Sequence, residues 1–344
     1  MPKPKIGLAL GSGSARGWSH IGIIEALGEK GISPDIVCGC SIGAMVGAAY
    51  VADRMSPLKE WVLALKWREI AGSISVGISR GGLIDGDVFK NLMTKLNIDE
   101  PIESYMRPFA SVATDFATGR EIWLNDGPVH EAVRASMALP GVFSPANHDG
   151  GWLLDGGLVN PVPVSACRSL GADFVIAVNL NENLTDGRLK ARGTDDGQKM
   201  HQGTQSPILD GLFQKMPTNI QQRLSKTKPD LQTPKPVAPG YFEVLESSIN
   251  IMQEQITQVR LSAEPPDFIL APRVAHMGLF EFQRAQEAIV EGRTCVEQAL
   301  PELRPLLTKC GVKLVPRAQR AVHTVVDSPQ SELSKRTSPD LNMH

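Results

Sequence analysis

Short apolar runs alternate with stretches of helical periodicity along the first half of the chain, and this alternation constrains the fold most strongly. The apolar run 5–10 ends in a Gly-rich turn, and the segment 18–30 then repeats apolar residues at helical spacing. A second apolar run at 35–39 and a second helical pattern at 42–53 follow directly. Two consecutive strand–helix units predict a mostly parallel sheet with helices packed on its faces.

The same patterns predict the remaining elements. Further helices are expected at 57–67, 85–96, 129–137, 163–170, 242–261 and 281–300. Further strands are expected at 109–114, 121–124, 152–154, 174–179 and 268–270. The alternation continues without an internal repeat, so the chain is expected to belong to the α/β class.

The composition changes along the chain and divides the predicted domain into parts. We expect one domain over 5–315, with its core at 5–180. The segment from about 181 to 240 is rich in Lys, Gln, Thr, Asp, Gly and Pro, which predicts a polar insert. A C-terminal helical part at 241–315 returns to the same sheet, and the polar tail 316–344 is expected to be disordered.

Charge, cysteine content and hydropathy exclude several classes of protein. The formal net charge of −2 argues against a nucleic-acid partner, because phosphate binding requires an excess of Lys and Arg. The five cysteines have no second close pair to complement Cys38 and Cys40 in a zinc site, and they read as reduced thiols. The N-terminus lacks the pattern of a signal peptide, so we expect a cytoplasmic protein. The uncharged run 36–52 is rich in Gly and Ala, which favours a buried strand and helix over a membrane span.

The motif Gly39-Cys-Ser41-Ile-Gly43 fits the pattern Gly-x-Ser-x-Gly of a nucleophile elbow. In such an elbow a serine sits on a sharp turn between a strand and a helix, and the flanking glycines relieve crowding. The predicted strand at 35–39 and helix at 42–53 supply that context. The alternative is a tight turn whose serine only caps the helix.

A glycine-rich loop between the first strand and first helix could supply backbone N–H groups to an oxyanion. Its residues are Gly11, Ser12, Gly13, Ser14, Ala15, Arg16 and Gly17. A dinucleotide-binding turn is the rival interpretation, but the third glycine comes one residue late and Asp35 precedes the second strand instead of ending it. A phosphate-binding P-loop fails because Trp18 stands where Lys is required.

The residues alone do not decide which group would act as the base. None of the histidines considered has flanking residues that mark a catalytic site; these are His20, His148, His201 and His276. Asp155 ends a predicted strand and precedes two glycines, which places an acid at the open edge of a parallel sheet. An ordinary Asp-Gly turn explains the same residues. Three other acids, Asp85, Asp87 and Asp115, also lie in predicted loops.

Taken together, the glycine-rich loop, the Gly-x-Ser-x-Gly motif, the run 134–143 and Asp155-Gly-Gly157 resemble the patatin-like phospholipases, and most nearly their bacterial RssA-like branch. The resemblance covers about 5–180 well and implies a three-layer patatin-like fold. It implies a dyad with Ser41 as nucleophile and Asp155 as base, an oxyanion hole in the loop Gly11 to Gly17, and an elbow formed by Gly39 and Gly43. It further implies that the site is shaped by Ser136, Pro140, Gly156 and Gly157.

The resemblance also implies a chemistry and a type of substrate. Family members hydrolyse acyl esters of lipids through an acyl-enzyme and need no metal or cofactor. A carboxylate with a pKa of about 4 is a poor base for serine in water, so the site must be partly dry. We therefore expect a lipid or acyl-ester substrate and peripheral contact with the inner membrane from its cytoplasmic side. The apolar patch 208–213 could touch a lipid surface, but such a patch more often covers the protein's own core, and we favour that interpretation. The alternatives are a regulatory or lipid-binding protein on the same fold and an acyltransferase, and neither oligomeric state nor a regulatory partner is predicted.

Overall fold

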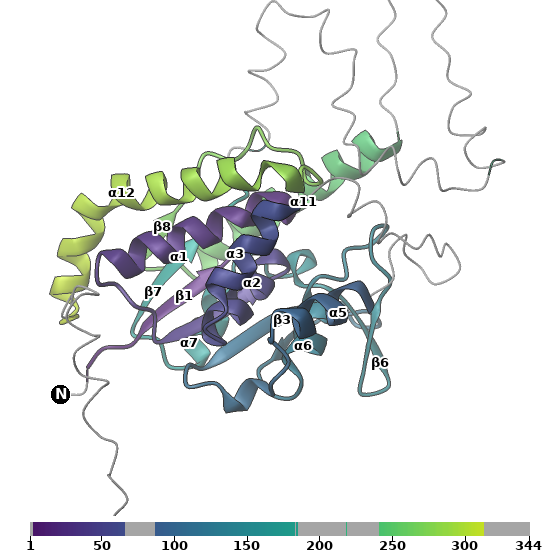
Figure 1. The fold of residues 1–344 in the computed structure, drawn as a ribbon, viewed down its shortest axis with the longest axis horizontal. Coiled ribbons are helices and arrows are strands. Elements are labelled where there is room, and N and C mark those ends of the chain that lie inside the picture. The colour runs from purple at the N-terminus through teal and green to yellow at the C-terminus, as the bar shows by residue number, and fades with distance from the viewer. Residues whose placement is uncertain (1–2, 66–86, 183, 185–217, 219–240, 313–344) are drawn as a thin grey trace, which may run out of the picture.

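The computed structural model describes residues 3–65, 87–182, 184, 218 and 241–312 of the chain. In this part a sheet of eight strands lies between helices, with the order β5-β6-β3-β2-β1-β7-β8 and with β4 on β3 (Figure 1). The strands are β1 Ile6–Leu10, β2 Ile36–Cys40, β3 Phe109–Asp115, β4 Glu121–Leu124, β5 Ala146–His148, β6 Gly151–Asp155, β7 Phe174–Val178 and β8 Phe268–Leu270. The α/β class predicted from the sequence is confirmed.

The sheet is parallel through its centre and antiparallel at one end. Strands β3, β2, β1, β7 and β8 run parallel in consecutive pairs. Strands β4 and β6 pair antiparallel with β3, and β5 pairs antiparallel with β6. This mostly parallel arrangement matches the prediction, and it brings the C-terminal ends of β1 and β2 to one edge of the sheet, where ligand sites form in such folds.

Helices cover both faces of the sheet. They are α1 Ser19–Glu29, α2 Ile42–Val51, α3 Met55–Ala64, α5 Asp87–Lys95, α6 Val129–Ser136, α7 Val164–Ser169, α11 Tyr241–Ala263 and α12 Ala285–Lys309. Short 3₁₀ segments are η1 Ser14–Trp18, η3 Ile102–Ser104, η4 Gly156–Leu158 and η5 Phe282–Arg284.

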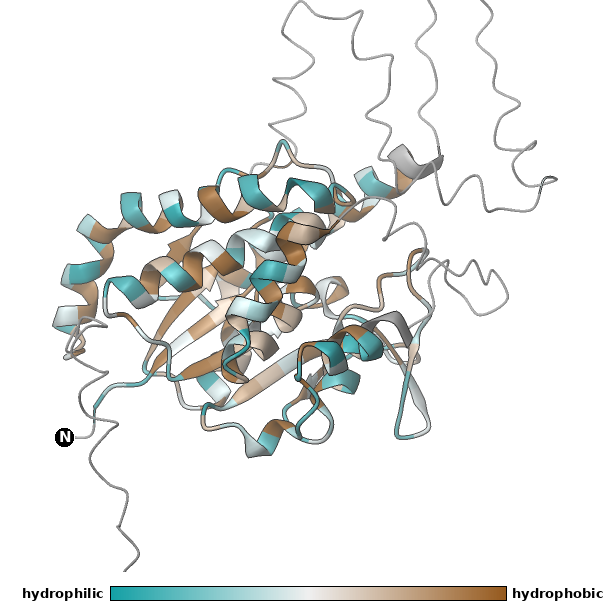
Figure 2. Ribbon diagram, viewed as in Figure 1, coloured by the Kyte–Doolittle hydropathy of each residue, from teal (hydrophilic) through white to brown (hydrophobic). Residues whose placement is uncertain are grey.

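The side chains of β1 show how the two faces divide. Ile6, Leu8 and Leu10 join the larger apolar cluster with residues of α1, α2 and α12. Ala9 joins the smaller cluster with residues of α7 on the opposite face. Figure 2 shows hydrophobic residues concentrated in the strands and along one side of α12. The alternation along β1 therefore produces the three layers, helix, sheet and helix.

Helices α1 and α12 pack with their backbones in direct contact. A Cβ atom added at Gly22 would overlap the carbonyl oxygen of Ile289, and one added at Gly292 would overlap the carbonyl oxygen of Ser19. The two glycines thus remove the side chains that would hold the helices apart. Through this contact the C-terminal part of the chain is joined to the first strand–helix unit.

Some elements differ from the sequence prediction. Helix α12 continues to Lys309 although Pro301 and Pro305 lie inside it. Both prolines are exposed, so the carbonyl groups that lose an N–H partner face solvent, and the helix bends at this end (Figure 1). Strand β5 was not predicted, because its three residues include only one apolar side chain.

Several predictions lie wholly or partly outside the described residues. These are most of the polar insert 181–240 with the patch 208–213 and His201, the tail 316–344, Asp85, and the end of the predicted helix 57–67. The division of the chain into core, insert, helical part and tail therefore remains a prediction.

Candidate active site

The nucleophile candidate and the acid candidate meet because two strand ends meet on one edge of β3. Strand β2 pairs with the first half of β3 and ends with Cys40 opposite Val112. Strand β6 runs in the opposite direction along the second half of β3 and places Asp155 opposite Ala113. Strand β4 pairs with residues from both halves of β3 and so occupies one edge of β3. Strands β2 and β6 therefore lie end to end along the other edge of β3. Topology alone thus brings Ser41, the residue after β2, to Asp155.

Ser41 occupies a sharp turn between β2 and α2. Its φ of 55° and ψ of −122° place it in a region that residues with a side chain rarely adopt, at a cost of about 1–3 kcal/mol. An added Cβ at Gly39 would overlap the backbone of Ala44, and one at Gly43 would overlap the carbonyl oxygen of Leu10. Both flanking positions therefore require glycine, as a nucleophile elbow does.

The Ser41 hydroxyl donates a hydrogen bond of 2.7 Å to Oδ2 of Asp155. The second oxygen of Asp155, Oδ1, accepts the backbone N–H of Gly157 at 2.7 Å. The backbone of Asp155 is held as well, since its N–H donates to Ala138 O and its carbonyl accepts the Thr114 hydroxyl. The carboxylate therefore has a single orientation, facing Ser41.

Burial gives Asp155 an unusual affinity for protons. Only 1% of the residue is exposed. Burial raises the pKa of Asp155 to about 6, while the hydrogen bonds from Ser41 and Gly157 act in the lowering direction. A carboxylate with this pKa is mostly ionised at neutral pH and still accepts a proton far more readily than an exposed aspartate.

The glycine-rich loop offers fewer free N–H groups than its sequence suggests. The amides of Gly11, Ser12 and Ala15 donate to Val178, Pro161 and Leu279, and the Arg16 amide donates to Gly13. Gly17 packs against the side chain of Ile42. Within the described part of the chain, the amides of Gly13 and Ser14 have no acceptor, and both residues line the pocket beside Ser41.

The side chain of Arg16 holds this loop in place from behind. It is 1% exposed, and its Nε donates to the carbonyl oxygen of Gly13 while Nη2 donates to Oδ1 of Asn250 in α11. The Gly13 carbonyl and the Ser14 N–H belong to the same peptide group. By holding this carbonyl on the buried side, Arg16 orients the Ser14 N–H. The predicted oxyanion residue Arg16 therefore supports the loop and does not face the pocket.

The predicted site-shaping residues have separate roles. The Ser136 hydroxyl accepts the backbone N–H of Ser41 at 2.7 Å and donates to Val112 O at 2.5 Å, so it braces the elbow. Gly156 lies so close to Val112 that a Cβ would overlap its carbonyl oxygen. Pro140 is not among the residues that line the pocket, although its neighbour Leu139 is.

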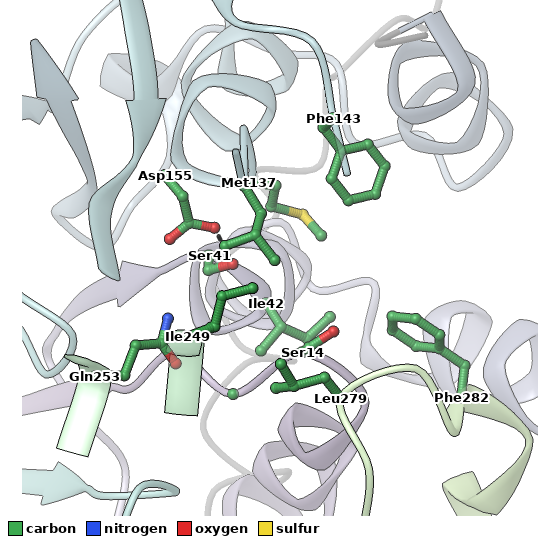
Figure 3. Close-up of a pocket in the computed structure, with 12 residues that line it drawn as sticks. Ser14, Ser41, Ile42, Met137, Phe143, Asp155, Ile249, Gln253, Leu279 and Phe282 are labelled. Atoms are coloured by element: carbon green, nitrogen blue, oxygen red, sulfur yellow. Dashed lines mark hydrogen bonds between the residues drawn. The ribbon is translucent and has the colours of Figure 1, made fainter. Parts of the chain in front are cut away.

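The pocket around Ser41 and Asp155 is mostly apolar (Figure 3). Its other lining residues are Gly13, Ser14, Ile42, Met137, Leu139, Phe143, Ile249, Gln253, Leu279 and Phe282. The last four were not found from the sequence, because they come from α11 and from the segment before α12, more than 200 residues after Ser41. The sequence contained one signal for them, a row of polar residues at helical spacing in the segment that forms α11.

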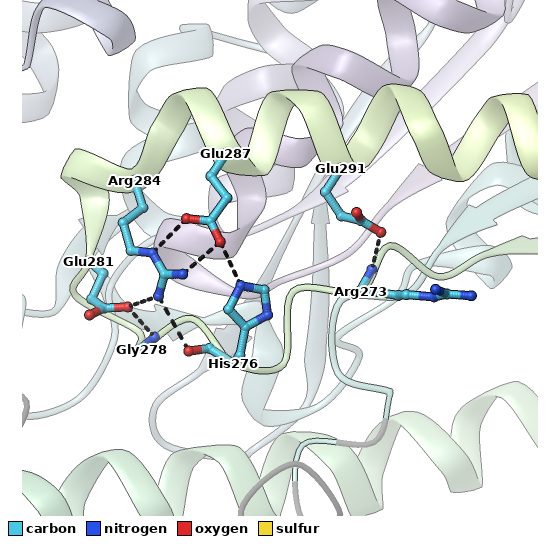
Figure 4. A network of polar contacts seen from close by, with 7 residues as sticks. All are labelled: Arg273, His276, Gly278, Glu281, Arg284, Glu287 and Glu291. Atoms are coloured by element: carbon cyan, nitrogen blue, oxygen red, sulfur yellow. Dashed lines mark hydrogen bonds and ion pairs between the residues drawn. The ribbon is translucent and has the colours of Figure 1, made fainter. Parts of the chain in front are cut away.

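A polar network supports the wall that contains Leu279 (Figure 4). Arg284 binds the carboxylates of Glu281 and Glu287, and Glu281 accepts the backbone N–H of Gly278. The N–H of Leu279 donates to Glu246 of α11, and its carbonyl accepts the Ala15 N–H at 3.0 Å. Through the N–H and the carbonyl of the single residue Leu279, α11 and the glycine-rich loop are thus both bonded to this wall.

The other candidates lie away from Ser41. His20 is buried and its Nε2 bonds to the carbonyl of Gly11, His276 contacts Glu287 at the surface, and Asp115 binds Thr118 in a turn. No described histidine hydrogen-bonds to Ser41 or Asp155. Among the described residues, no group of three His, Cys, Asp or Glu side chains is arranged to hold a metal.

No helix in the described part of the chain is both long and apolar enough to cross a membrane. The cysteines are all free thiols, and Cys38, Cys40 and Cys167 are buried. The run 36–52 forms β2 and α2 inside the protein, as predicted.

The fold and the site together define an α/β protein with a strand–serine–helix elbow, in which the serine hydroxyl bonds an aspartate at the end of a nearby strand. The model of the patatin-like phospholipase family matches residues 8–168. An uncharacterized NTE family protein of Mycobacterium tuberculosis is 31% identical over 330 residues, which cover 86% of this chain and 91% of that protein. The chain therefore belongs to the patatin-like phospholipase family, as the resemblance predicted.

Larger eukaryotic proteins match a shorter part of the chain. The human patatin-like phospholipase domain-containing protein 6 is 34% identical over 182 residues, which are 51% of this chain and 13% of that protein. Lysophospholipase nte1 of Emericella nidulans is 35% identical over 185 residues, 51% of this chain and 12% of that protein. The solved structure of VipD from Legionella pneumophila matches 90% of this chain and 80% of that chain at 13% identity, with a TM-score of 0.35.

Proposed function

We propose that this protein is a serine acyl hydrolase of the phospholipase A, lysophospholipase or esterase type, which cleaves carboxylic esters of lipids through a Ser–Asp dyad. The single observation that carries the proposal is the 2.7 Å hydrogen bond from Ser41 Oγ to the buried carboxylate of Asp155. Membership in the patatin-like phospholipase family supports a lipid ester as substrate. The name of the Emericella relative, a lysophospholipase, points in the same direction.

The reaction proceeds in two steps. Asp155 accepts the Ser41 proton while Ser41 Oγ attacks the ester carbonyl, and the amides of Gly13 and Ser14 stabilise the resulting oxyanion. Collapse of this intermediate returns the proton to the leaving alcohol and leaves the acyl group on Ser41. Water then attacks the acyl-enzyme, Asp155 takes its proton, and the fatty acid departs from Ser41. No step needs a metal or cofactor.

The lining of the pocket supports an acyl substrate. Met137 and Phe143 lie on one side of Ser41 and Ile249 approaches from α11 (Figure 3), and Leu139 also lines the pocket. Such a lining favours a hydrocarbon chain, since burying apolar surface contributes about 25 cal/mol per Å². It also keeps water from Asp155, which maintains the raised pKa on which proton transfer from Ser41 depends.

Labelling with a fluorophosphonate probe, followed by an ester screen over acyl lengths and head groups, tests the proposal. Wild type should be labelled on Ser41 and hydrolyse esters, and Ser41→Ala should do neither. Unchanged labelling of the variant excludes Ser41 as nucleophile. A wild type that is folded but inert supports a regulatory or lipid-binding protein on the same fold, and ester products that form only with an added alcohol indicate an acyltransferase.

We infer a cytoplasmic protein that meets its substrate at the inner membrane surface, with one domain at 5–315 that the polar insert 181–240 interrupts. We also predict that the chain belongs to the RssA-like branch of the family. The bacterial relatives reported above carry the NTE family name.

A further inference from the structure

Helix α11 carries a polar side chain, Gln253, in the wall of the candidate active site. On one side of Gln253 along the helix, Asn250 accepts a hydrogen bond of 2.9 Å from Arg16. On the other side, Thr257 accepts a hydrogen bond of 3.3 Å from Asn181. These two contacts fix the segment of α11 that carries Gln253, in which this residue is only 5% exposed.

The carboxamide of Gln253 directs its nitrogen toward Ser41 and Asp155 and its oxygen away from them (Figure 3). A Cβ atom added at Gly157 would lie 2.5 Å from Gln253 Nε2 and 3.0 Å from Asp155 Oδ1, so the glycine leaves room for this nitrogen beside the proposed base. The orientation is the favourable one, because a carboxylate attracts an N–H group and repels a carbonyl oxygen. Gln253 therefore presents a hydrogen-bond donor to the proposed dyad.

This donor has no acceptor within the protein. Gln253 Nε2 makes no hydrogen bond with any group in the described part of the chain, and Oε1 is buried without a partner. An N–H group that lines a pocket without an acceptor is available to an acceptor atom of a substrate. The substrate atom that meets it must lie close to Asp155.

An ester has two oxygens that could meet this donor. In the proposed mechanism the carbonyl oxygen faces the amides of Gly13 and Ser14 in the glycine-rich loop. The other oxygen, which leaves with the alcohol, must come close to Asp155 because it receives the proton that Asp155 took from Ser41. Since Gln253 Nε2 lies beside Asp155, it matches the position of the leaving oxygen.

We propose that Gln253 Nε2 donates a hydrogen bond to the leaving oxygen of the ester, and that this contact makes the enzyme selective for oxygen esters over thioesters. The inference rests on the proposed function and deepens it. When the tetrahedral intermediate collapses, the bond between the acyl carbon and the leaving oxygen breaks and its electron pair stays on the oxygen. The proton held by Asp155 then passes to this oxygen. The N–H group of Gln253 stabilises the negative charge that develops on it during this step.

A thioester distinguishes this role from a purely structural one. Its sulfur is a weak hydrogen-bond acceptor, and a thiolate leaves more readily than an alkoxide, so its departure depends little on Gln253. Its carbonyl oxygen still needs the amides of Gly13 and Ser14. General damage to the pocket therefore slows both substrates, whereas loss of the donor slows the oxygen ester alone.

The experiment compares the ethyl ester and the S-ethyl thioester of one fatty acid in wild type, Gln253→Met and Gln255→Met. Gln253→Met keeps the length of the side chain and removes the donor, and Gln255→Met is the matched control because Gln255 lies on the exposed side of the same helix. The measured quantity is kcat/KM for release of the fatty acid. Both substrates are measured on the same preparation, so the fraction of folded enzyme cancels in their ratio. Fluorophosphonate labelling of each variant reports an intact Ser41 site.

We expect Gln253→Met to lose about tenfold in kcat/KM for the ester and less than about twofold for the thioester, as removal of one hydrogen bond to a charged oxygen predicts. Gln255→Met should keep the wild-type ratio of the two values. An equal loss with both substrates, or no loss with the ester, overturns the role of Gln253 while leaving the Ser41 mechanism in place. A folded wild type that cleaves neither substrate and is not labelled by the probe overturns the proposed function as well, so the two failures are distinguishable.

Discussion

Asp155 is the residue in which burial and hydrogen bonding oppose each other most directly. Removal from water favours its neutral form, while the Ser41 hydroxyl and the Gly157 amide favour the carboxylate. The resulting pKa of about 6 suits a base that works near neutral pH without histidine. The serine in turn depends on this carboxylate, because an isolated hydroxyl is a weak nucleophile.

The pH dependence of acylation follows from this pKa. Asp155 accepts the Ser41 proton only when ionised, so kcat/KM should rise about tenfold per pH unit below pH 6 and level off above it. The measurement is the rate of p-nitrophenyl ester cleavage at low substrate concentration from about pH 4.5 to 8. A rate that falls with rising pH, or that does not change through pH 6, contradicts the assignment.

The sequence predicted Ser41 and its flanking glycines because an elbow is a local pattern, and Asp155 because of a family resemblance. It did not predict which amides of the glycine-rich loop are free. That depends on acceptors far along the chain, such as the carbonyls of Val178 and Leu279. Gln253 was missed for the same reason, since its role depends on where α11 packs.

At the scale of elements, α11 is the clearest departure from simple hydrophobic patterning. Its buried side carries Asn250, Gln253 and Thr257, while Ile251 and Val259 are about half or more exposed. A stripe of apolar residues usually marks the buried face of a helix. In α11 the stripe with Ile251 and Val259 lies on the outer face, and the inner face, which contacts the glycine-rich loop and the candidate site, combines polar residues with the apolar Ile249. The position of the helix was therefore predictable and its orientation was not.

The α1–α12 contact yields a prediction with a control on the same helix. Gly22→Ala should destabilise the protein by about 1–3 kcal/mol or more, because the new methyl group overlaps the Ile289 carbonyl and forces the helices apart. Gly28→Ala, also in α1, meets nothing within 4 Å and should be neutral or stabilise by up to about 1 kcal/mol. Urea unfolding measures both changes. Equal effects of the two variants would show that the helices are not in backbone contact.

At the scale of the whole molecule, two buried groups give opposite dependences of stability on pH. Burial lowers the pKa of His20 to about 4, so its contribution to the free energy of unfolding is gained as pH rises from about 4 to 6.5. Asp155 has its pKa raised from 3.8 to about 6, so its contribution is present at low pH and lost as pH rises through 6. Each of the two contributions to the free energy of unfolding amounts to about 3 kcal/mol. Between about pH 4 and 6.5 they change in opposite directions and largely cancel.

Replacing one of the two groups should expose the contribution that it makes. In Asp155→Asn the carboxyl no longer titrates, so the unfolding free energy of the variant minus that of wild type should increase by about 2.4 kcal/mol between pH 4 and 7. Urea unfolding of both proteins at each pH gives this difference, in which the titration of all other groups cancels. A difference that stays constant with pH would mean that Asp155 is not perturbed in the folded state.

The most direct measurement of the central claim is the mass of the protein caught during turnover. Wild type quenched with acid while it hydrolyses an activated ester should carry one acyl group, and digestion should locate that group on the peptide containing Ser41. Asp155→Asn should accumulate it far more slowly. An acyl group on another residue, or ester cleavage without any covalent adduct in either protein, would contradict the Ser41–Asp155 account.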